Sequence, residues 1–239
     1  MTVAELIDRA LTLDSDDYWE VVSELQARND AETYAAAVEL TRDANPDRRK
    51  LGVDILSQLG ATRSDEDRPY RGPSVDLLLE RIATEPHPHV IASILNAFGP
   101  LHDPRTIGPT VAFASHPDEH IRLAVVHGLF QHDDDRVVDT LLALMEDPDD
   151  DVRDWATFEL GSINTRDTPQ VREALAARLT DRYVDVRHEA IAGLALRADP
   201  RGLAPLIEDY EDGWEGPLID EAGEAYVEAG LIAEWPPPE

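Results

Sequence analysis

One sequence pattern recurs along the middle of the chain at nearly regular intervals. Four windows align without gaps, at residues 86–100, 116–130, 147–161 and 181–195, and a weaker copy covers 45–60. With the arginine of the Val-Arg pair as origin, the intervals between successive copies are 42, 31, 31 and 34 residues. The five origins are Arg49, Ile91, Arg122, Arg153 and Arg187. A period in the low thirties has room for two helices per unit.

Apolar residues in each window recur at helical spacing. Offsets −1, +3 and +7 from the origin lie within about 80° of one another on a helical wheel, which predicts a buried stripe. Three further helices are expected between the windows, at 136–147, 168–181 and 200–212, and no run alternates with period two as a strand would. Two short helices cannot bury their shared face alone, so the units must stack on one another. We therefore predict an all-α fold, a right-handed α-α superhelix or solenoid.

The two ends of the chain lack the repeat and are expected to cap it. Residues 1–44 contain three predicted helices, around 3–11, 18–28 and 31–42, and residues 213–239 contain one more, at 215–229, followed by a frayed tail. Repeats fill residues 45–212, and an insertion loop at 62–74 accounts for the long first interval. The prediction is a single repeat domain over 1–239.

The repeated motif resembles a known family. An Asp-Pro turn, a V-R-x-x-A-x-x-x-L-G helix and a second Asp-Pro that opens the next unit are similar to HEAT-like repeats of the phycobilisome-lyase type, with an armadillo-type fold; the resemblance covers roughly residues 40–212. It implies a hydrogen-bonded ladder between units, made by the arginine and an acidic residue six positions before it. Ile91 should interrupt this ladder, and His116 replaces the acid of one unit. The ladder residues expected to be structural are Arg49, Arg122, Arg153, Arg187, Asp147 and Asp181.

Charge and composition exclude several classes of protein. With 50 acidic and 21 basic side chains the formal charge is −29, which argues against nucleic-acid binding, because phosphate recognition needs basic patches. Without cysteine, the chain has no disulfide, thiolate zinc site or thiol nucleophile. We find no secretion signal and no run long enough to span a membrane, and we expect a cytoplasmic protein. A single lysine and many aspartates fit either a high-salt cytoplasm or a GC-rich genome.

Catalytic and metal-binding patterns are missing from the sequence. The His188-Glu189 pair looks like those of deoxyhypusine hydroxylase, a HEAT-repeat di-iron enzyme, but that site resembles four such pairs and this chain has one. The aspartate runs at 133–135 and 149–151 lack the glycine and distal glutamate of an EF-hand, and fit helix caps instead. Phosphate-binding loops, nucleophile elbows and zinc-protease motifs are absent. No catalytic residue, metal or cofactor is predicted.

The face opposite the core stripe is the first candidate binding surface. Offsets +1, +2, +5 and +9 point away from the stripe, and the resemblance implies that these helices line a concave groove. Aromatic and apolar side chains at positions expected to be solvated suggest partner binding. The alternative is that Trp155 and Phe158 pack as ordinary core. The predicted strip comprises Trp155, Phe158, Leu123, His127, Asp154, Asn96, His188 and Glu189.

The insertion loop is the second candidate surface. It gathers basic and aromatic side chains in an acidic protein, at Arg63, Arg68, Tyr70 and Arg71. Loops on rigid scaffolds often carry function, although a tolerated surface insertion explains the same residues.

Three functions follow from these observations, two of them based on protein binding and one enzymatic. The first is a non-catalytic scaffold that holds a basic protein or peptide in its groove, with acidic rims that speed association. The second is an immunity or inhibitor protein directed against a basic toxin or nuclease. The third is an enzyme or lyase subunit acting on a small molecule or a bilin chromophore. The sequence leaves open the identity of the partner and the oligomeric state.

Overall fold

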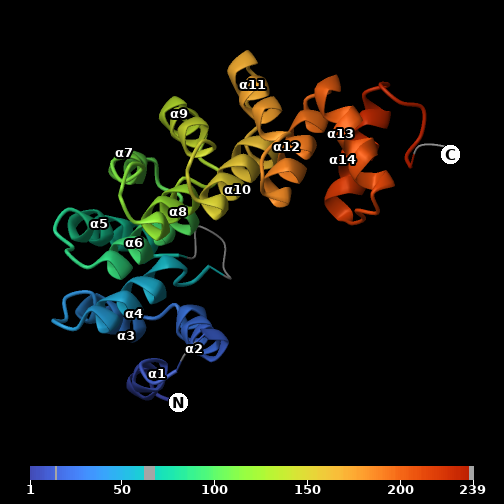
Figure 1. Cartoon of the computed structure of the whole chain (residues 1–239). Coiled ribbons are helices and arrows are strands. Elements are labelled where there is room, and N and C mark those ends of the chain that lie inside the picture. The colour runs from blue at the N-terminus through green and yellow to red at the C-terminus, as the bar shows by residue number, and fades with distance from the viewer. Residues whose placement is uncertain (14, 62–67, 237–239) are drawn as a thin grey trace. The chain divides into compact units, whose positions relative to one another are not determined.

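The computed structural model describes residues 1–13, 15–61 and 68–236. Throughout these residues the secondary structure is helical, with turns and loops between the helices and no strand, which confirms the predicted all-α class (Figure 1). None of the helices in the described ranges has the length and apolar character that a membrane crossing requires. The chain divides into two compact units, Met1–Phe130 and Gln131–Glu239, which we describe separately. A single domain over 1–239 stays a prediction.

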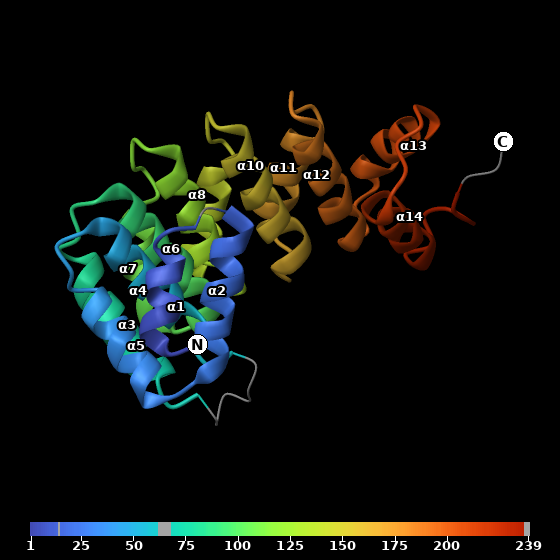
Figure 2. The same ribbon diagram turned by 90° about the horizontal axis from the view of Figure 1, so that it is seen from below.

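The first unit is built from helical hairpins that pack side by side. In Figures 1 and 2 its even-numbered helices follow one another as a layer, with α2 against α4, α4 against α6 and α6 against α8. The short α7 follows a 3-10 turn at Pro104–Thr106. The helices are α1 (Val3–Ala10), α2 (Ser15–Arg28), α3 (Ala31–Leu40), α4 (Pro46–Ser57), α5 (Arg71–Ile82), α6 (Pro88–Leu101), α7 (Ile107–Val111) and α8 (Glu119–Gly128).

The second unit repeats this arrangement. Helix α10 packs against α12 and α12 against α14, and α11 packs against α12 (Figure 1). We call the even-numbered helices of both units the second helices and the odd-numbered ones the first helices. The elements are α9 (Asp135–Leu144), α10 (Asp150–Phe158), the π-helical turn η3 (Glu159–Ile163), α11 (Pro169–Arg178), α12 (Val184–Leu196), a 3-10 turn (Pro200–Gly202), α13 (Leu203–Glu211) and α14 (Pro217–Glu228).

Polar side chains cap the helices where the sequence predicts helix starts. Asp134 accepts a hydrogen bond from the backbone of Arg136, and Asp149 accepts one from the backbone of Val152 at 3.1 Å. Such caps stabilise a helix by about 1 kcal/mol each. The aspartate runs therefore contribute to helix starts, as the sequence analysis expects.

The predicted stripe forms the core of both units. Every non-glycine residue at offsets −1, +3 and +7 of the four strong repeats is at most 1% exposed. In the second unit, Gly193 of α12 also meets Gly161 of η3, because a Cβ built on Gly193 would lie 2.8 Å from the Cα of Gly161. The close approach of these two backbones leaves no room for a larger residue.

The insertion loop is shorter than predicted. Helix α5 begins at Arg71, so the last four residues of the predicted segment 62–74 are helical. Residues 62–67 of this segment, including Arg63, lie outside the described residues. The predicted helix start is too late because Gly72 and Pro73 resemble loop residues, whereas proline is well tolerated in a first helical turn.

The C-terminal tail contacts the cap in its described part. The ring of Trp235 packs edge-on against Tyr210, with centroids 5.1 Å apart, and covers Gly223 of α14. Its Nε1 donates to Asp220 at 3.4 Å. The frayed tail expected from the proline-rich ending therefore does not extend to Trp235, because this indole finds an apolar surface next to Gly223.

Candidate functional site

Two arginines of the repeat pair with the acid of the following unit. Arg49 makes two hydrogen bonds to Glu85, at 2.9 and 2.7 Å, and Arg153 makes two to Asp181, both at 2.9 Å. Burial raises the pKa of Glu85, but the bonds from Arg49 outweigh it and leave that pKa below its usual value. Because both guanidinium groups are bonded internally, they are not available to an external anion.

All four arginines at the repeat origins bind the backbone of their own unit. Each donates from Nη1 to the carbonyl six residues before it. This bond therefore fixes the turn that precedes each second helix, whether or not the arginine reaches the next unit. The donor and acceptor pairs are Arg49 with Asp43, Arg122 with His116, Arg153 with Asp147 and Arg187 with Asp181.

The unit with Ile91 shows how the pattern changes when the arginine is lost. Ile91 is buried and offers no donor. The following unit has His116 at the acidic position, and its Nδ1 accepts from the backbone of Asp118 at 3.1 Å. Asp147 and Asp181 make the same local bond with their carboxylates. The unit that lacks the arginine is thus followed by a unit that lacks the acid. A carboxylate at position 116 would find no guanidinium group at position 91 to pair with.

We use the name second-helix strip for the side chains at offsets +1, +2 and +5 of each second helix. In the first unit this strip includes Asn96, which is exposed, and Leu123 and His127, which are half-buried. His127 Nδ1 lies 3.1 Å from Asn96 Oδ1, and burial lowers the pKa of His127. These three predicted residues therefore lie on one surface of the first unit, on α6 and α8.

At α4 the strip is filled by an internal network that the sequence analysis did not find. Asp54 is buried and accepts hydrogen bonds from Tyr18, Ser93 and Lys50, the last at 2.6 Å. The Lys50 ammonium also lies 5.4 Å from the ring centre of Trp19. Tyr18 and Trp19 carry no repeat landmark, so only the pairing of α2 with α4 brings them to this position.

In the second unit the strip exposes aromatic surface. Trp155 is 41% exposed and meets Phe158 edge to face, with ring centroids 5.8 Å apart; Phe158 is half-buried. For Trp155 the structure therefore favours the solvated alternative over the core alternative. This places an indole on the surface of α10, where a partner can reach it.

His188 departs from the prediction for the strip. It is only 8% exposed, because the ring of Trp214 lies against it at 5.0 Å and Asp209 approaches its Nε2 at 3.3 Å. His188 is therefore not part of the solvated surface, although its helical offset points that way. Trp214, which is 45% exposed, presents its indole next to it and was missed because it lies outside the repeated window.

Two acids of the strip have no cation partner. Asp154 and Glu189 are half-buried; Oδ1 of Asp154 is enclosed without a hydrogen-bond partner among the described residues, and the hydroxyl of Ser162 approaches the carboxyl of Glu189. Burial and the charges of Asp185 and Asp151 raise the pKa of Asp154 to about 6. Burial and the charge of Asp154 raise the pKa of Glu189 to about 7. This part of the surface therefore carries negative charge that the protein does not itself neutralise.

A third acid, Glu159, lies in the core at η3. It is 1% exposed, and its Oε1 accepts from the backbone of Gln131 at 2.7 Å. Burial raises its pKa to about 7. Between the pKa of an unfolded glutamate, about 4.3, and 7, the folded chain binds more protons than the unfolded one. Glu159 therefore stabilises the fold at low pH, and this contribution is lost as the pH rises through 7.

Replacing Glu159 with glutamine should change how stability depends on pH. Between pH 5.5 and pH 8, we expect the free energy of unfolding of wild type to fall by about 1–2 kcal/mol relative to that of Glu159→Gln, because only wild type must ionise a buried acid. Urea unfolding of both proteins at the two pH values measures this. Burial lowers the pKa values of His127 and His188, so these two histidines change the stability with pH in the opposite direction. Their contributions are the same in both proteins and cancel when wild type is compared with the variant. A wild-type-to-variant difference that stays constant with pH would contradict the assignment.

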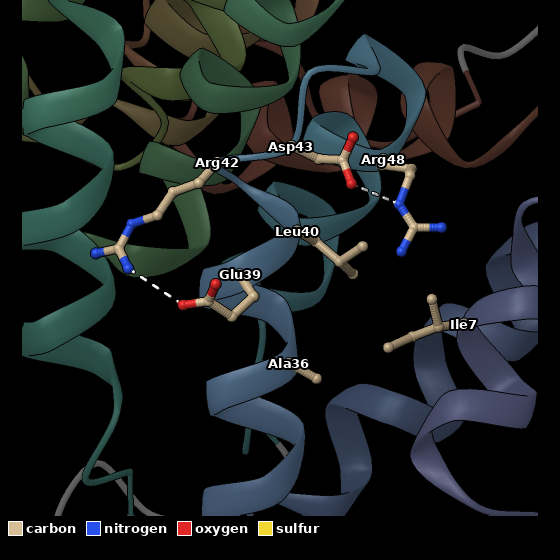
Figure 3. Close-up of a pocket in the computed structure, with 7 residues that line it drawn as sticks. All are labelled: Ile7, Ala36, Glu39, Leu40, Arg42, Asp43 and Arg48. Atoms are coloured by element: carbon tan, nitrogen blue, oxygen red, sulfur yellow. Dashed lines mark hydrogen bonds and ion pairs between the residues drawn. The ribbon is translucent and has the colours of Figure 1, made fainter.

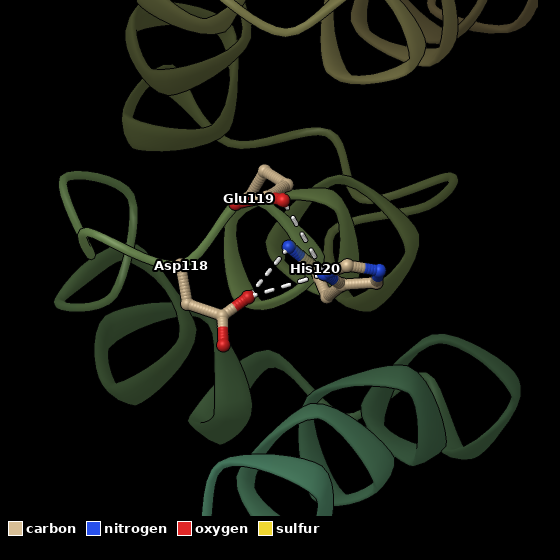
Figure 4. Close-up of side chains that lie close together, drawn as sticks. All are labelled: Asp118, Glu119 and His120. Atoms are coloured by element: carbon tan, nitrogen blue, oxygen red, sulfur yellow. Dashed lines mark hydrogen bonds and ion pairs between the residues drawn. The ribbon is translucent and has the colours of Figure 1, made fainter.

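Two acids and a histidine at the start of α8 have the composition of a metal site, but they lie on an exposed helix start. Asp118, Glu119 and His120 lie close together at the start of α8 (Figure 4). They are consecutive in sequence, and Asp118 also accepts from the backbone of His120 as the helix cap. Glu119 and His120 are exposed. The group is accounted for as a helix start, and we propose no metal there.

A cavity of about 460 Å³ lies beside α1 and α3 (Figure 3). Its charged groups already pair with one another: Arg42 approaches Glu39 at 3.3 Å and Arg48 approaches Asp43 at 2.8 Å. Its lining also includes the apolar side chains of Ile7, Ala36 and Leu40. It therefore presents neither an unpaired charge nor an acid–base pair to a substrate.

The loop candidates make contacts within the first unit. Tyr70 stacks on Tyr34, with ring centroids 4.6 Å apart. Arg71 donates to the carbonyls of Leu101 and His102 at 2.8 and 3.0 Å. Arg68 is half-buried, and Arg63 lies outside the described residues. Arg71 and Tyr70 thus join helices together, which gives them a structural reason to be there.

Comparisons with known proteins agree with this geometry. The family of HEAT repeats matches residues 75–161 and 139–226. Protein YibA of Escherichia coli K12 is 27% identical over 212 residues, which cover 84% of this chain and 72% of YibA. The X-ray structure of the E. coli protein aligns with a TM-score of 0.73 at 22% identity, covering 98% of this chain and 89% of that one.

A second solved structure shares the fold at lower identity. It is a designed armadillo repeat protein in complex with the peptide (KR)4, with a TM-score of 0.54 and 13% identity, covering 81% of this chain and 98% of that one. At such identities the likeness concerns the fold alone. Both neighbours are repeat solenoids, which agrees with the stacked hairpins described above.

Proposed function

Because the chain belongs to the HEAT-repeat family, whose fold is typical of protein-interaction scaffolds, we propose that it is a non-catalytic scaffold that binds a protein or peptide along the second-helix strip. The observation that carries this proposal is the surface of α10 and α12. There an exposed indole, Trp155, lies next to Asp154, an acid without a cation partner. Aromatic anchors supply much of the affinity in protein interfaces.

The proposed partner is basic. The formal charge of −29 attracts cationic partners and speeds their association at low salt. A fold neighbour, the designed armadillo repeat protein, is in complex with a peptide of lysine and arginine, which supports the same class of ligand for this chain. A concave groove as the seat of the partner, the phycobilisome-lyase subtype and a cytoplasmic location remain predictions. Inhibition of a basic toxin is one role within this proposal, and a toxin gene next to this one would support it.

Trp155→Ala is expected to reduce partner capture at least tenfold, because it removes an exposed aromatic anchor without opening the core. Affinity purification from the source organism, at low and high salt, with quantitative mass spectrometry measures the capture. Leu231→Ala is the matched control, since Leu231 is 40% exposed and lies outside the strip. Circular dichroism verifies that both variants fold. If Trp155→Ala and Phe158→Ala capture the same proteins in the same amounts as wild type, the strip is not the binding surface.

A further inference from the structure

In the second unit, arginine side chains neutralise two of the enclosed acids. Arg153 pairs with Asp181, while Arg201 and Arg172 pair with Asp199. Each of these carboxylates is 6% exposed at its side chain. Paired in this way, both acids have pKa values below the usual range. A guanidinium group therefore keeps each of these two enclosed acids ionised.

Asp154 and Glu189, like Glu159, have no guanidinium partner among the described residues. Oδ1 of Asp154 is enclosed without a hydrogen-bond partner there, and the carboxyl of Glu189 is approached by the neutral hydroxyl of Ser162. The two side chains lie on adjacent helices, α10 and α12, and are near enough for the charge of Asp154 to raise the pKa of Glu189. An unpaired enclosed carboxylate is costly, and two that repel each other are more so. A cation from outside the chain would relieve both.

Trp155 adds a contact that discriminates among cations. It follows Asp154 in α10 and is 41% exposed, so part of its indole faces solvent. A guanidinium group is planar, can bridge two carboxylates through parallel N–H bonds, and stacks on an indole face. A lysine ammonium is a compact, strongly hydrated charge without a planar face. It should therefore bind two carboxylates and an indole more weakly than a guanidinium group does.

We infer that Asp154, Glu189 and Trp155 form a receptor for an arginine side chain of the partner. This inference rests on the proposed function and makes it more specific, because it names the residue of the partner that the strip recognises. Charge complementarity supports it, since Asp185 adds negative charge near both acids and Asp151 adds it near Asp154. The arginine completes, from another molecule, the pairing that Arg153 and Arg201 provide internally elsewhere in the unit.

Peptide titration tests the receptor. Full-length protein is titrated at pH 8, where both acids are ionised, with a fluorescein-labelled octapeptide of alternating arginine and serine, and binding is followed by anisotropy. A peptide with lysine at every arginine position is the comparison ligand. Asp154→Asn and Glu189→Gln should each weaken binding of the arginine peptide at least tenfold. The lysine peptide should bind wild type at least fivefold more weakly than the arginine peptide.

Two control variants keep the test independent of net charge and folding. Asp139→Asn on α9 and Glu208→Gln on α13 make the same chemical changes at exposed positions of first helices, and should leave the Kd within twofold. Loss of binding in the controls equal to that in the strip variants would mean that net charge, not a receptor, holds the peptide.

Three results would overturn the receptor. They are no measurable binding of the arginine peptide to wild type, an unchanged Kd in Asp154→Asn and Glu189→Gln, and equal affinity for the lysine peptide. None of them decides whether Trp155→Ala abolishes capture of the natural partner. The failure of the receptor is therefore distinguishable from the failure of the proposed function.

Discussion

Arg197→Met is expected to destabilise the second unit by about 3–5 kcal/mol. Arg197 is 9% exposed and donates hydrogen bonds to the carbonyls of Gly161, Gly193, Leu160, Asn164 and Arg166. Several of these carbonyls lie at the end of η3, where a helix leaves its last acceptors without partners. Each buried acceptor left unsatisfied costs about 1–3 kcal/mol, less where water can enter.

Urea unfolding monitored by circular dichroism measures this loss. Arg182→Gln is the control, since Arg182 is 70% exposed at its side chain and pairs with Asp150 on the surface, where such pairs contribute about 1 kcal/mol or less. Arg197→Lys should give an intermediate loss, because an ammonium group has three donors and Arg197 uses all its nitrogens. If Arg197→Met unfolds at the same urea concentration as Arg182→Gln, the bonds of Arg197 do not stabilise η3.

Arg153→Met is expected to lower the free energy of unfolding by about 3 kcal/mol. The change leaves Asp181 with a 3.4 Å contact to Arg178 as its remaining ion pair and the backbone N–H of Tyr183 as its hydrogen-bond donor, and it removes the bond from Arg153 to the carbonyl of Asp147. Removing one partner of a buried ion pair is more damaging than removing both, because the remaining charge stays desolvated. The loss should therefore be partly restored when Asp181→Asn is added.

A double-mutant cycle gives the coupling between these two residues. Unfolding free energies of wild type, Arg153→Met, Asp181→Asn and the double variant should show a coupling of at least about 1 kcal/mol. The variants share one fold if their circular dichroism spectra agree. Additive effects of the two substitutions would show that Arg153 and Asp181 are not coupled across the repeat.

The burial pattern of the repeat could be predicted from sequence because it depends on periodicity alone. Val152 and Leu194 share offsets with residues of other units, and all of them are enclosed. Equivalent positions in stacked hairpins meet equivalent neighbours. The replacement of the acid by His116, in the unit after Ile91, is consistent with this equivalence. The imidazole of His116 accepts the backbone hydrogen bond that the carboxylate accepts in other units.

Exposure on the strip could be predicted only in part. A helical offset gives the direction in which a side chain leaves its own helix, but not what lies in front of it. His188 points toward the strip and is covered by Trp214, and Asp54 does so and is enclosed by Tyr18 and Ser93. Trp214 and Tyr18 come from segments outside the repeated window, and Ser93 comes from the window of the next unit.

Arg197 and Glu159 illustrate a second limit. Arg197 lies ten residues beyond the landmark Arg187, and its partners are backbone carbonyls that no residue pattern marks. Glu159 lies at the start of η3, and its pKa is set by burial within the folded unit. Side-chain periodicity cannot show where an α-helix widens into a π-helical turn.

Photo-cross-linking of the arginine peptide to the full chain tests the binding surface most directly. A benzophenone group is placed at the centre of the peptide, and the modified residues are identified by mass spectrometry. Our account predicts adducts on α10 and α12, around Asp154, Trp155 and Glu189, and their loss in Trp155→Ala. Adducts confined to the first helices α9, α11 and α13 would contradict it.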